Sequence, residues 1–171
     1  MVSVEYTEDV ALNKHAKEAI LSADYIILGP GNYYCSVIPN LIVNGCKDAI
    51  SNTQAKLIFP VNLTNKQGHT LHWKVSDYVY DIESYLGRSV DIILINNCTP
   101  SEDQIMYYKM EEGDGVLTVD DMGNDTRVIR DNLLSDTIIT YNKADTVSGL
   151  RSFIRHDKTK LREAFIKICG E

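Results

Sequence analysis

Short runs of apolar residues alternate along the chain with longer segments in which apolar residues recur at helical spacing. The runs are typical of strands buried on both faces, and they cover Tyr25–Leu28, Lys56–Val61 and Asp91–Ile95. The helical segments span 13–23, 37–51 (with a break at Asn44-Gly45), 76–87, 102–111 and 157–169. Because buried strands alternate with helices, the pattern predicts an α/β fold with a mainly parallel sheet flanked by helices.

Weaker signals surround this core. Alternating residues predict a short strand at Val2–Tyr6, and Ser76 is expected to cap the helix that follows it. Further strand-like pieces lie between turns rich in Gly, Asp and Asn, at Gly115–Val119, Arg127–Arg130 and Thr137–Tyr141.

The first buried strand runs directly into Gly29-Pro30-Gly31. Ligands of parallel α/β sheets bind at the carboxyl ends of strands, and glycine lets a ligand approach the main chain closely. We expect Ser36 to cap the next helix, with the backbone N–H groups of Gly31 and Asn32 facing an anion at its start. A tight strand-to-helix turn without a ligand would give the same pattern.

Polar loops follow the other two buried strands, "VNLTN" at 61–65 and "INNCTPSED" at 95–103. Because adjacent parallel strands end at the same edge of a sheet, their side chains are expected to surround one crevice. The residues concerned are Asn62, Thr64, Asn65, Asn96 and Asn97. The alternative is that Asn and Thr simply populate turns, as they commonly do.

The formal net charge is −7, which disfavours non-specific binding to nucleic acid or to an anionic membrane. If the protein binds an anion, local donors such as backbone N–H groups or a single suitably positioned Arg must hold it.

Four widely spaced cysteines without a CxxC pair are typical of reduced thiols in a cytoplasmic protein. No apolar run has the length of a membrane span. His69 and His72 are interpreted as solvated loop residues, so we assign no metal ligand and no catalytic residue.

Several motifs together resemble the YvcK/CofD family, which comprises gluconeogenesis factors and 2-phospho-L-lactate transferases. They are "ADYIILGPGNYYCSVIPNLIV", "AKLIFPVNLTNKQGHT", "VSDYV", "DIILINN", "YYKMEEGDGV" and "IRHDKTKL", in the family's order over nearly the whole chain. The match is closer to the YvcK branch. It covers the family's C-terminal portion only, so residues 1–171 are expected to form a single α/β domain that lacks the N-terminal glycine loop.

The resemblance implies a Rossmann-like fold and a nucleotide or nucleotide-sugar ligand, with no other cofactor assigned. In the first reading the protein binds a UDP-sugar and regulates cell shape and carbon metabolism without catalysis. In the second it is half of a CofD-type transferase of phosphorus-containing groups. In the third it is an interaction module whose site has decayed. A homo-oligomer, or assembly with a complementary N-terminal chain, is the expected partner arrangement.

The resemblance also assigns individual residues. Tyr108 corresponds to a family tyrosine implicated in UDP-sugar binding, and Arg155 to a family arginine of the same site, where a guanidinium can bind a diphosphate through two hydrogen bonds. The alternatives are a core Tyr and a surface Arg paired with Asp157. The complete predicted ligand-binding set is Gly29, Gly31, Asn32, Ser36, Asn62, Thr64, Tyr108 and Arg155.

The chain departs from the YvcK pattern in two loops. Residues 32–36 read Asn-Tyr-Tyr-Cys-Ser instead of Ser-Leu-Tyr-Thr-Ser, and residues 64–70 read Thr-Asn-Lys-Gln-Gly-His-Thr instead of Thr-Gln-Pro-Gly-Glu-Thr. His69 replaces the Glu, and Tyr78 replaces a common His. These departures leave the identity of the ligand open.

Overall fold

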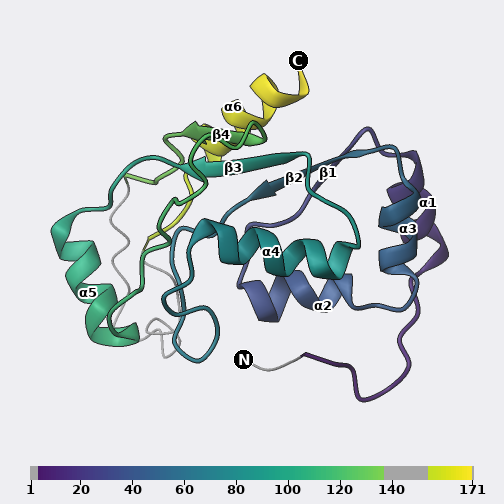
Figure 1. Ribbon diagram of the computed structural model, residues 1–171, viewed down its shortest axis with the longest axis horizontal. Coiled ribbons are helices and arrows are strands. Elements are labelled where there is room, and N and C mark those ends of the chain that lie inside the picture. The colour runs from purple at the N-terminus through teal and green to yellow at the C-terminus, as the bar shows by residue number, and fades with distance from the viewer. Residues whose placement is uncertain (1–3, 137–153, 171) are drawn as a thin grey trace.

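A computed structural model describes residues 4–136 and 154–170. Its sheet contains four strands in the order β1-β2-β3-β4, and all three neighbouring pairs are parallel (Figure 1). The strands are β1 (Tyr25–Ile27), β2 (Lys56–Pro60), β3 (Ile92–Asn96) and β4 (Val128–Asp131). The predicted parallel α/β sheet is therefore confirmed.

Helices connect the strands and lie on both sides of the sheet. They are α1 (Lys14–Ser22), the π-helix η1 (Tyr33–Val37), α2 (Ile38–Leu41), α3 (Cys46–Asn52), α4 (Val75–Leu86), α5 (Glu102–Glu112) and α6 (Lys158–Cys169). Figure 1 shows α2 and α4 along one face, α6 over the other, and α5 beyond the carboxyl end of β3. No helix among residues 4–136 and 154–170 is long and apolar enough to cross a membrane.

Alternation along β3 explains why its sequence is apolar throughout. Ile93 and Ile95 belong to the large core that α2 and α4 cover, whereas Leu94 packs with Leu133 and with Ala164 of α6. Successive side chains of a strand point to opposite faces, so a strand covered on both faces needs an apolar residue at every position. The sheet thus has two hydrophobic layers, and its carboxyl edge is left for polar loops.

Several local predictions need correction. β1 is an edge strand and its Ile27 is 44% exposed, so it is not buried on both faces. Residues 4–6 form no strand, and residues 115–119 make only isolated bridges, because neither segment finds a continuous partner. Ser76 lies within the first turn of α4, whose N-cap is Lys74. The predicted strand at 137–141 lies outside the described residues.

An aromatic cluster joins the segment after β1 to α4. The hydroxyls of Tyr33 and Tyr34 donate to one oxygen of Asp81, at 2.9 and 3.2 Å. The rings of Trp73 and Tyr78 contact Tyr33 edge-on, with centroids 5.8 and 5.1 Å from it. Burial and the nearby Asp81 carboxylate raise the pKa of Tyr33, so its hydroxyl remains a proton donor. These contacts make the two tyrosines structural anchors of the loop.

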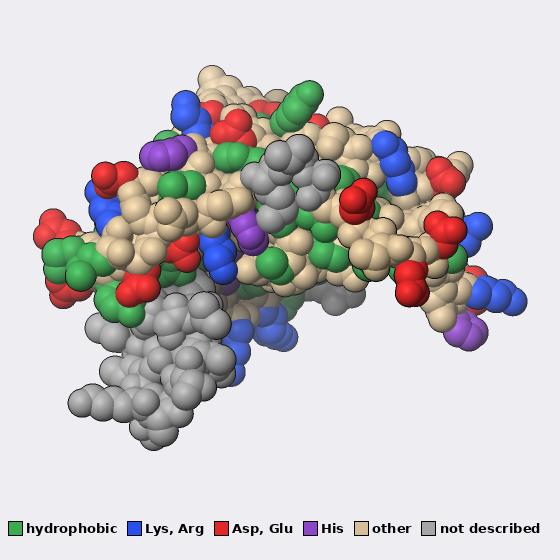
Figure 2. All heavy atoms as spheres, turned by 90° about the horizontal axis from the view of Figure 1, so that it is seen from below, with side chains coloured by type: hydrophobic (Ala, Val, Ile, Leu, Met, Phe, Trp, Pro, Cys, Tyr) green, Lys and Arg blue, Asp and Glu red, His purple; other side chains and the backbone are tan. Residues whose placement is uncertain are grey.

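Charged side chains of both signs are interspersed over the face shown in Figure 2, with hydrophobic side chains between them. This face carries no continuous basic patch of the kind that nucleic-acid binding requires.

Asn65 holds the long loop after β2 in place. Its side chain is 2% exposed, and its amide donates to the carbonyls of Trp73 (2.9 Å) and Gly115 (2.8 Å). Its carbonyl oxygen accepts from the hydroxyls of Tyr78 (3.0 Å) and Thr118 (3.4 Å). One buried side chain therefore satisfies several backbone and side-chain groups from three separate segments.

We predict that Asn65→Ala lowers the free energy of unfolding by about 2–3 kcal/mol, because buried carbonyls and a tyrosine hydroxyl lose their partners. Urea unfolding followed by circular dichroism measures the change. Asn52→Ala is the control, since the exposed Asn52 amide donates only to the Asp48 carbonyl of its own helix. An equal effect of both substitutions would contradict the role given to Asn65.

Candidate functional site

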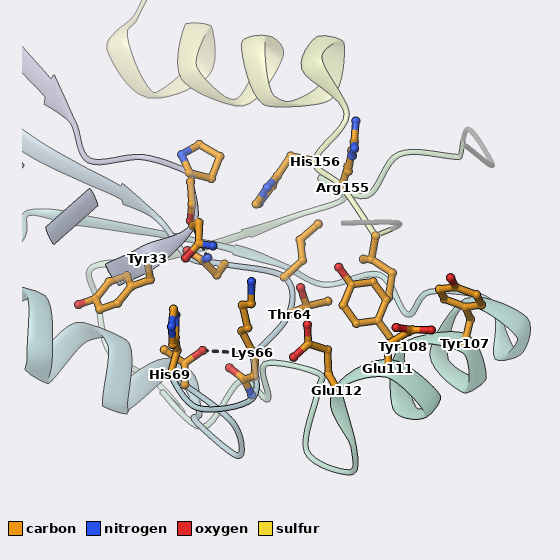
Figure 3. A pocket seen from close by; sticks show the side chains of 18 residues that line it. Tyr33, Thr64, Lys66, His69, Tyr107, Tyr108, Glu111, Glu112, Arg155 and His156 are labelled. Atoms are coloured by element: carbon orange, nitrogen blue, oxygen red, sulfur yellow. Dashed lines mark hydrogen bonds between the residues drawn. The ribbon is translucent and has the colours of Figure 1, made fainter. Parts of the chain in front are cut away.

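A cavity of about 460 Å³ opens at the carboxyl edge of the sheet (Figure 3). Its walls come from the loop after β1, the loop after β2, the second half of α5 and the segment just before α6. The lining residues are Pro30, Gly31, Asn32, Tyr33, Asn62, Leu63, Thr64, Asn65, Lys66, His69, Thr70, Tyr107, Tyr108, Glu111, Glu112, Ile154, Arg155 and His156. Segments far apart in the sequence thus meet where parallel α/β sheets bind ligands.

The glycine loop has a backbone that few other residues would adopt. Gly29 has a φ of +101°, and a side chain at Gly31 would come within 3.3 Å of the Ser36 Cβ. The Asn62 amide donates to the Gly31 carbonyl at 2.9 Å, which fastens this loop to the loop after β2. No acceptor among the described residues pairs with the backbone N–H of Gly31 or of Asn32. These N–H groups remain available at the cavity wall.

Ser36 does not cap a helix, contrary to the prediction. It lies inside η1, a five-residue π-helix that leads into the four-residue α2, whose N-cap is Val37. The backbone oxygen of Asn32 instead accepts from the N–H groups of Cys35 and Ser36, at 3.0 and 2.7 Å. With such short helical segments, the expected helix-start contribution to anion binding is small.

Lys66 is the basic residue that the loop after β2 contributes to the cavity. Its backbone N–H donates to the Thr70 hydroxyl at 3.1 Å, and its carbonyl accepts from the N–H groups of His69 and Thr70. Figure 3 shows the Lys66 side chain directed into the cavity. The turn thus fixes the backbone from which the ammonium group extends.

His156 and His69 line the same cavity as neutral imidazoles. Burial lowers the pKa of His156 to about 4, although a hydrogen bond with the Val61 backbone opposes the shift. Burial, and then the positive charge of Lys66, also lower the pKa of His69. His69 is therefore not the solvated loop histidine that was expected, whereas His72 is exposed.

α5 supplies both an aromatic and an acidic wall. Tyr108 is buried against Val116 and Ile154, and Figure 3 shows its hydroxyl end toward the cavity. Glu111 and Glu112 lie one turn further along, and Glu112 accepts the Gln67 backbone N–H at 2.8 Å. Tyr108 is therefore partly a core residue, as the alternative reading held, and also a lining residue.

Three buried side-chain atoms in the described part of the chain have no hydrogen-bond partner: Asn62 Oδ1, His69 Nδ1 and His156 Nε2. All three residues line this cavity. Buried polar atoms without partners are rare in folded proteins and cost about 1–3 kcal/mol each. Their concentration around one cavity makes this cavity the candidate binding site.

The cavity brings together most of the predicted ligand-binding set. Six members line it, namely Gly31, Asn32, Asn62, Thr64, Tyr108 and Arg155, whereas Gly29 and Ser36 are not lining residues. Figure 3 shows the Arg155 side chain at the rim, directed away from Lys66. Whether these residues bind a ligand remains a prediction.

The third polar loop does not take part. The Asn96 amide donates to the Cys98 carbonyl at 2.6 Å and its oxygen accepts the Leu133 N–H, while the Asn97 N–H donates to Asp131. Neither residue lines the cavity. The Asn96 side chain is engaged in the turn and in the link to the segment after β4, and Asn97 is an exposed turn residue, in agreement with the turn-residue alternative.

Sequence reasoning missed Lys66, His69 and His156 as lining residues. The available signal was the departure of residues 64–70 from the family pattern, which places a Lys and a His in a loop already predicted at the edge. His156 gave no signal beyond its position beside Arg155.

Comparison with known proteins identifies the family. Residues 2–134 match the family model described as 2-phospho-L-lactate transferase CofD. The chain belongs to the CofD family. This CofD-family chain is 40% identical over 151 residues to a Thermotoga maritima protein assigned as a gluconeogenesis factor, covering 88% of this chain and 46% of that protein. It is 28% identical over 155 residues to the gluconeogenesis factor of Bacillus subtilis, and the match covers 90% of this chain and 45% of that protein.

Solved structures agree with this assignment. A Bacillus halodurans protein of the UPF0052 family superposes with a TM-score of 0.73 and 27% identity, covering 91% of this chain and 47% of that one. Another crystal structure of the same protein gives a TM-score of 0.77 with 25% identity, and the match covers 94% of this chain and 48% of that one. The CofD-family chain thus spans about half the length of these relatives.

We predict that stability falls by about 3 kcal/mol between pH 6.5 and pH 4 because His156 must gain a proton on unfolding. Its folded pKa is depressed, so its contribution is complete above pH 6.5 and is lost as the pH falls through about 4. Urea unfolding at several pH values measures the slope. His156→Gln should flatten it, whereas the exposed His15→Gln should not; an unchanged slope in His156→Gln would refute the assignment.

Proposed function

We propose that this chain binds a nucleotide sugar of the UDP-sugar type in the cavity and acts as a regulator rather than a catalyst. The observation that carries the proposal is the cluster of three unpartnered buried polar atoms, from Asn62, His69 and His156, around one cavity at the carboxyl edge of the sheet. A ligand rich in hydroxyl and amide groups would pair with these atoms.

The other lining groups match the remaining parts of such a ligand. A diphosphate would meet Lys66, Arg155 and the N–H groups of the glycine loop, and a sugar or base would meet Tyr108. The names of the Thermotoga maritima and Bacillus subtilis relatives support a gluconeogenesis-factor role, and through it a link to carbon metabolism. The link to cell shape rests on the resemblance to the YvcK branch alone. We expect the protein to act in the cytoplasm.

Isothermal titration of the purified chain with UDP-N-acetylglucosamine tests the proposal, with GDP as the control ligand. We expect saturable binding of the UDP-sugar and clearly weaker binding of GDP, which offers a diphosphate and a ribose but has a different base and no sugar beyond the diphosphate. Arg155→Ala should weaken binding by about tenfold or more, since a charge-assisted contact to phosphate contributes about 1.5–3 kcal/mol.

Arg162→Ala is the matched control, because Arg162 is exposed on α6 and does not line the cavity. Equal losses in the two variants would point to non-specific charge attraction. A folded protein that gives no heat with the UDP-sugar would overturn the ligand assignment.

A further inference from the structure

Lys66 differs from the other lysines of the described chain in its surroundings. It is only partly exposed, and no carboxylate of the described residues lies within ion-pairing distance of its ammonium group. Lys160, which is also only partly exposed, pairs with Asp136 at 2.9 Å. A recessed ammonium group normally has a counter-ion, because removal from water costs free energy.

The backbone beneath Lys66 is held on both sides. Asn65, the residue before it, is the buried centre of the loop's hydrogen bonds, and the buried Thr70 receives the Lys66 N–H. The Lys66 carbonyl closes the same turn through His69 and Thr70, at 3.1 and 3.0 Å. The ammonium group is thus presented to the cavity from a rigid base, as binding of a defined group requires.

Nearby groups do not supply the missing charge. His69 and His156 are neutral because burial lowers the pKa of each imidazole. Glu112 accepts the Gln67 N–H and keeps its negative charge, but it forms no ion pair with Lys66. The other acidic lining residue, Glu111, is exposed on α5 and also forms no ion pair with Lys66. Arg155, the second cation of the lining, points away from Lys66.

We propose that Lys66 is the specificity-determining residue of the cavity: its ammonium group binds the anionic phosphate of the ligand, with the Gly31 and Asn32 N–H groups as the neighbouring donors. This inference rests on the proposed function and deepens it by dividing the cavity into two parts. Phosphate lies between Lys66 and the glycine loop. Hydroxyl groups face the neutral imidazole of His156.

The tautomer of His156 determines what it accepts. One ring nitrogen hydrogen-bonds the Val61 backbone, so that nitrogen carries the proton and Nε2 presents a lone pair. A lone pair repels phosphate and accepts from a hydroxyl or N–H group. The ligand class is therefore a phosphate or diphosphate ester that carries free hydroxyl groups, rather than a neutral sugar or a bare cation.

The first test uses calorimetry with two probes, inorganic diphosphate and UDP-N-acetylglucosamine, on the full chain. Lys66→Met, which keeps the length but removes the charge, should weaken binding of both probes by about tenfold or more. Lys66→Arg should stay within about threefold of the original chain. Lys17→Met, on the exposed surface of α1, is the matched control and should change neither affinity.

The second readout is the pKa of His69, followed by NMR of its imidazole. The charge of Lys66 helps to lower this pKa, while Glu112 acts in the opposite direction. Lys66→Met should therefore raise it without any ligand, and diphosphate should raise it in the original chain. A variant that is folded but shows no rise would place Lys66 away from the cavity and overturn the inference.

The outcomes separate this inference from the proposed function. If diphosphate binds through Lys66 and the UDP-sugar does not bind, the phosphate subsite stands and the UDP-sugar assignment fails. If the UDP-sugar binds equally well to Lys66→Met, the ligand assignment stands and the role of Lys66 is refuted. If diphosphate does not bind the original chain at all, the Lys66 subsite is refuted directly.

Discussion

The parallel arrangement of the strands is the constraint on which the rest of the molecule depends. Since β1, β2 and β3 run in the same direction, the loops that leave β1 and β2 emerge at one edge and must meet there. The hydrogen bond from the Asn62 amide to the Gly31 carbonyl is the direct contact between them. A cavity at this edge follows from topology, before any side chain defines its chemistry.

Keeping that edge open requires anchors behind it. Asp81 on α4 accepts hydrogen bonds from the hydroxyls of Tyr33 and Tyr34. Asn65 donates hydrogen bonds to backbone carbonyls that hold the loop after β2 in place. These buried polar contacts are satisfied, whereas Asn62, His69 and His156 keep unpartnered atoms at the cavity wall. The supporting layer is thus fully hydrogen-bonded within the protein, whereas three atoms of the lining residues have no partner among the described residues.

Sequence patterns were sufficient for the sheet and most helices, because β2 and β3 are covered on both faces and leave a continuous apolar signal. They failed at β1, where an edge position exposes Ile27, and at Ser36, where a π-helix replaces the expected cap. The same limit applies to the site. Asn62 and Asn96 look alike in sequence, yet only the former lines the cavity, because the hydrogen bonds of Asn96 are made to Cys98 and Leu133.

The balance of charge in the cavity also explains why net charge is a poor guide to ligand choice here. The whole chain is acidic, yet Lys66 extends from a clamped turn into a cavity whose histidines are neutral. Two carboxylates of α5, Glu111 and Glu112, also line this cavity, but neither forms an ion pair with Lys66, so its ammonium group is left to attract an anion. An acidic protein can therefore select an anion, provided that the cation has no partner of its own and the groups beside it remain uncharged.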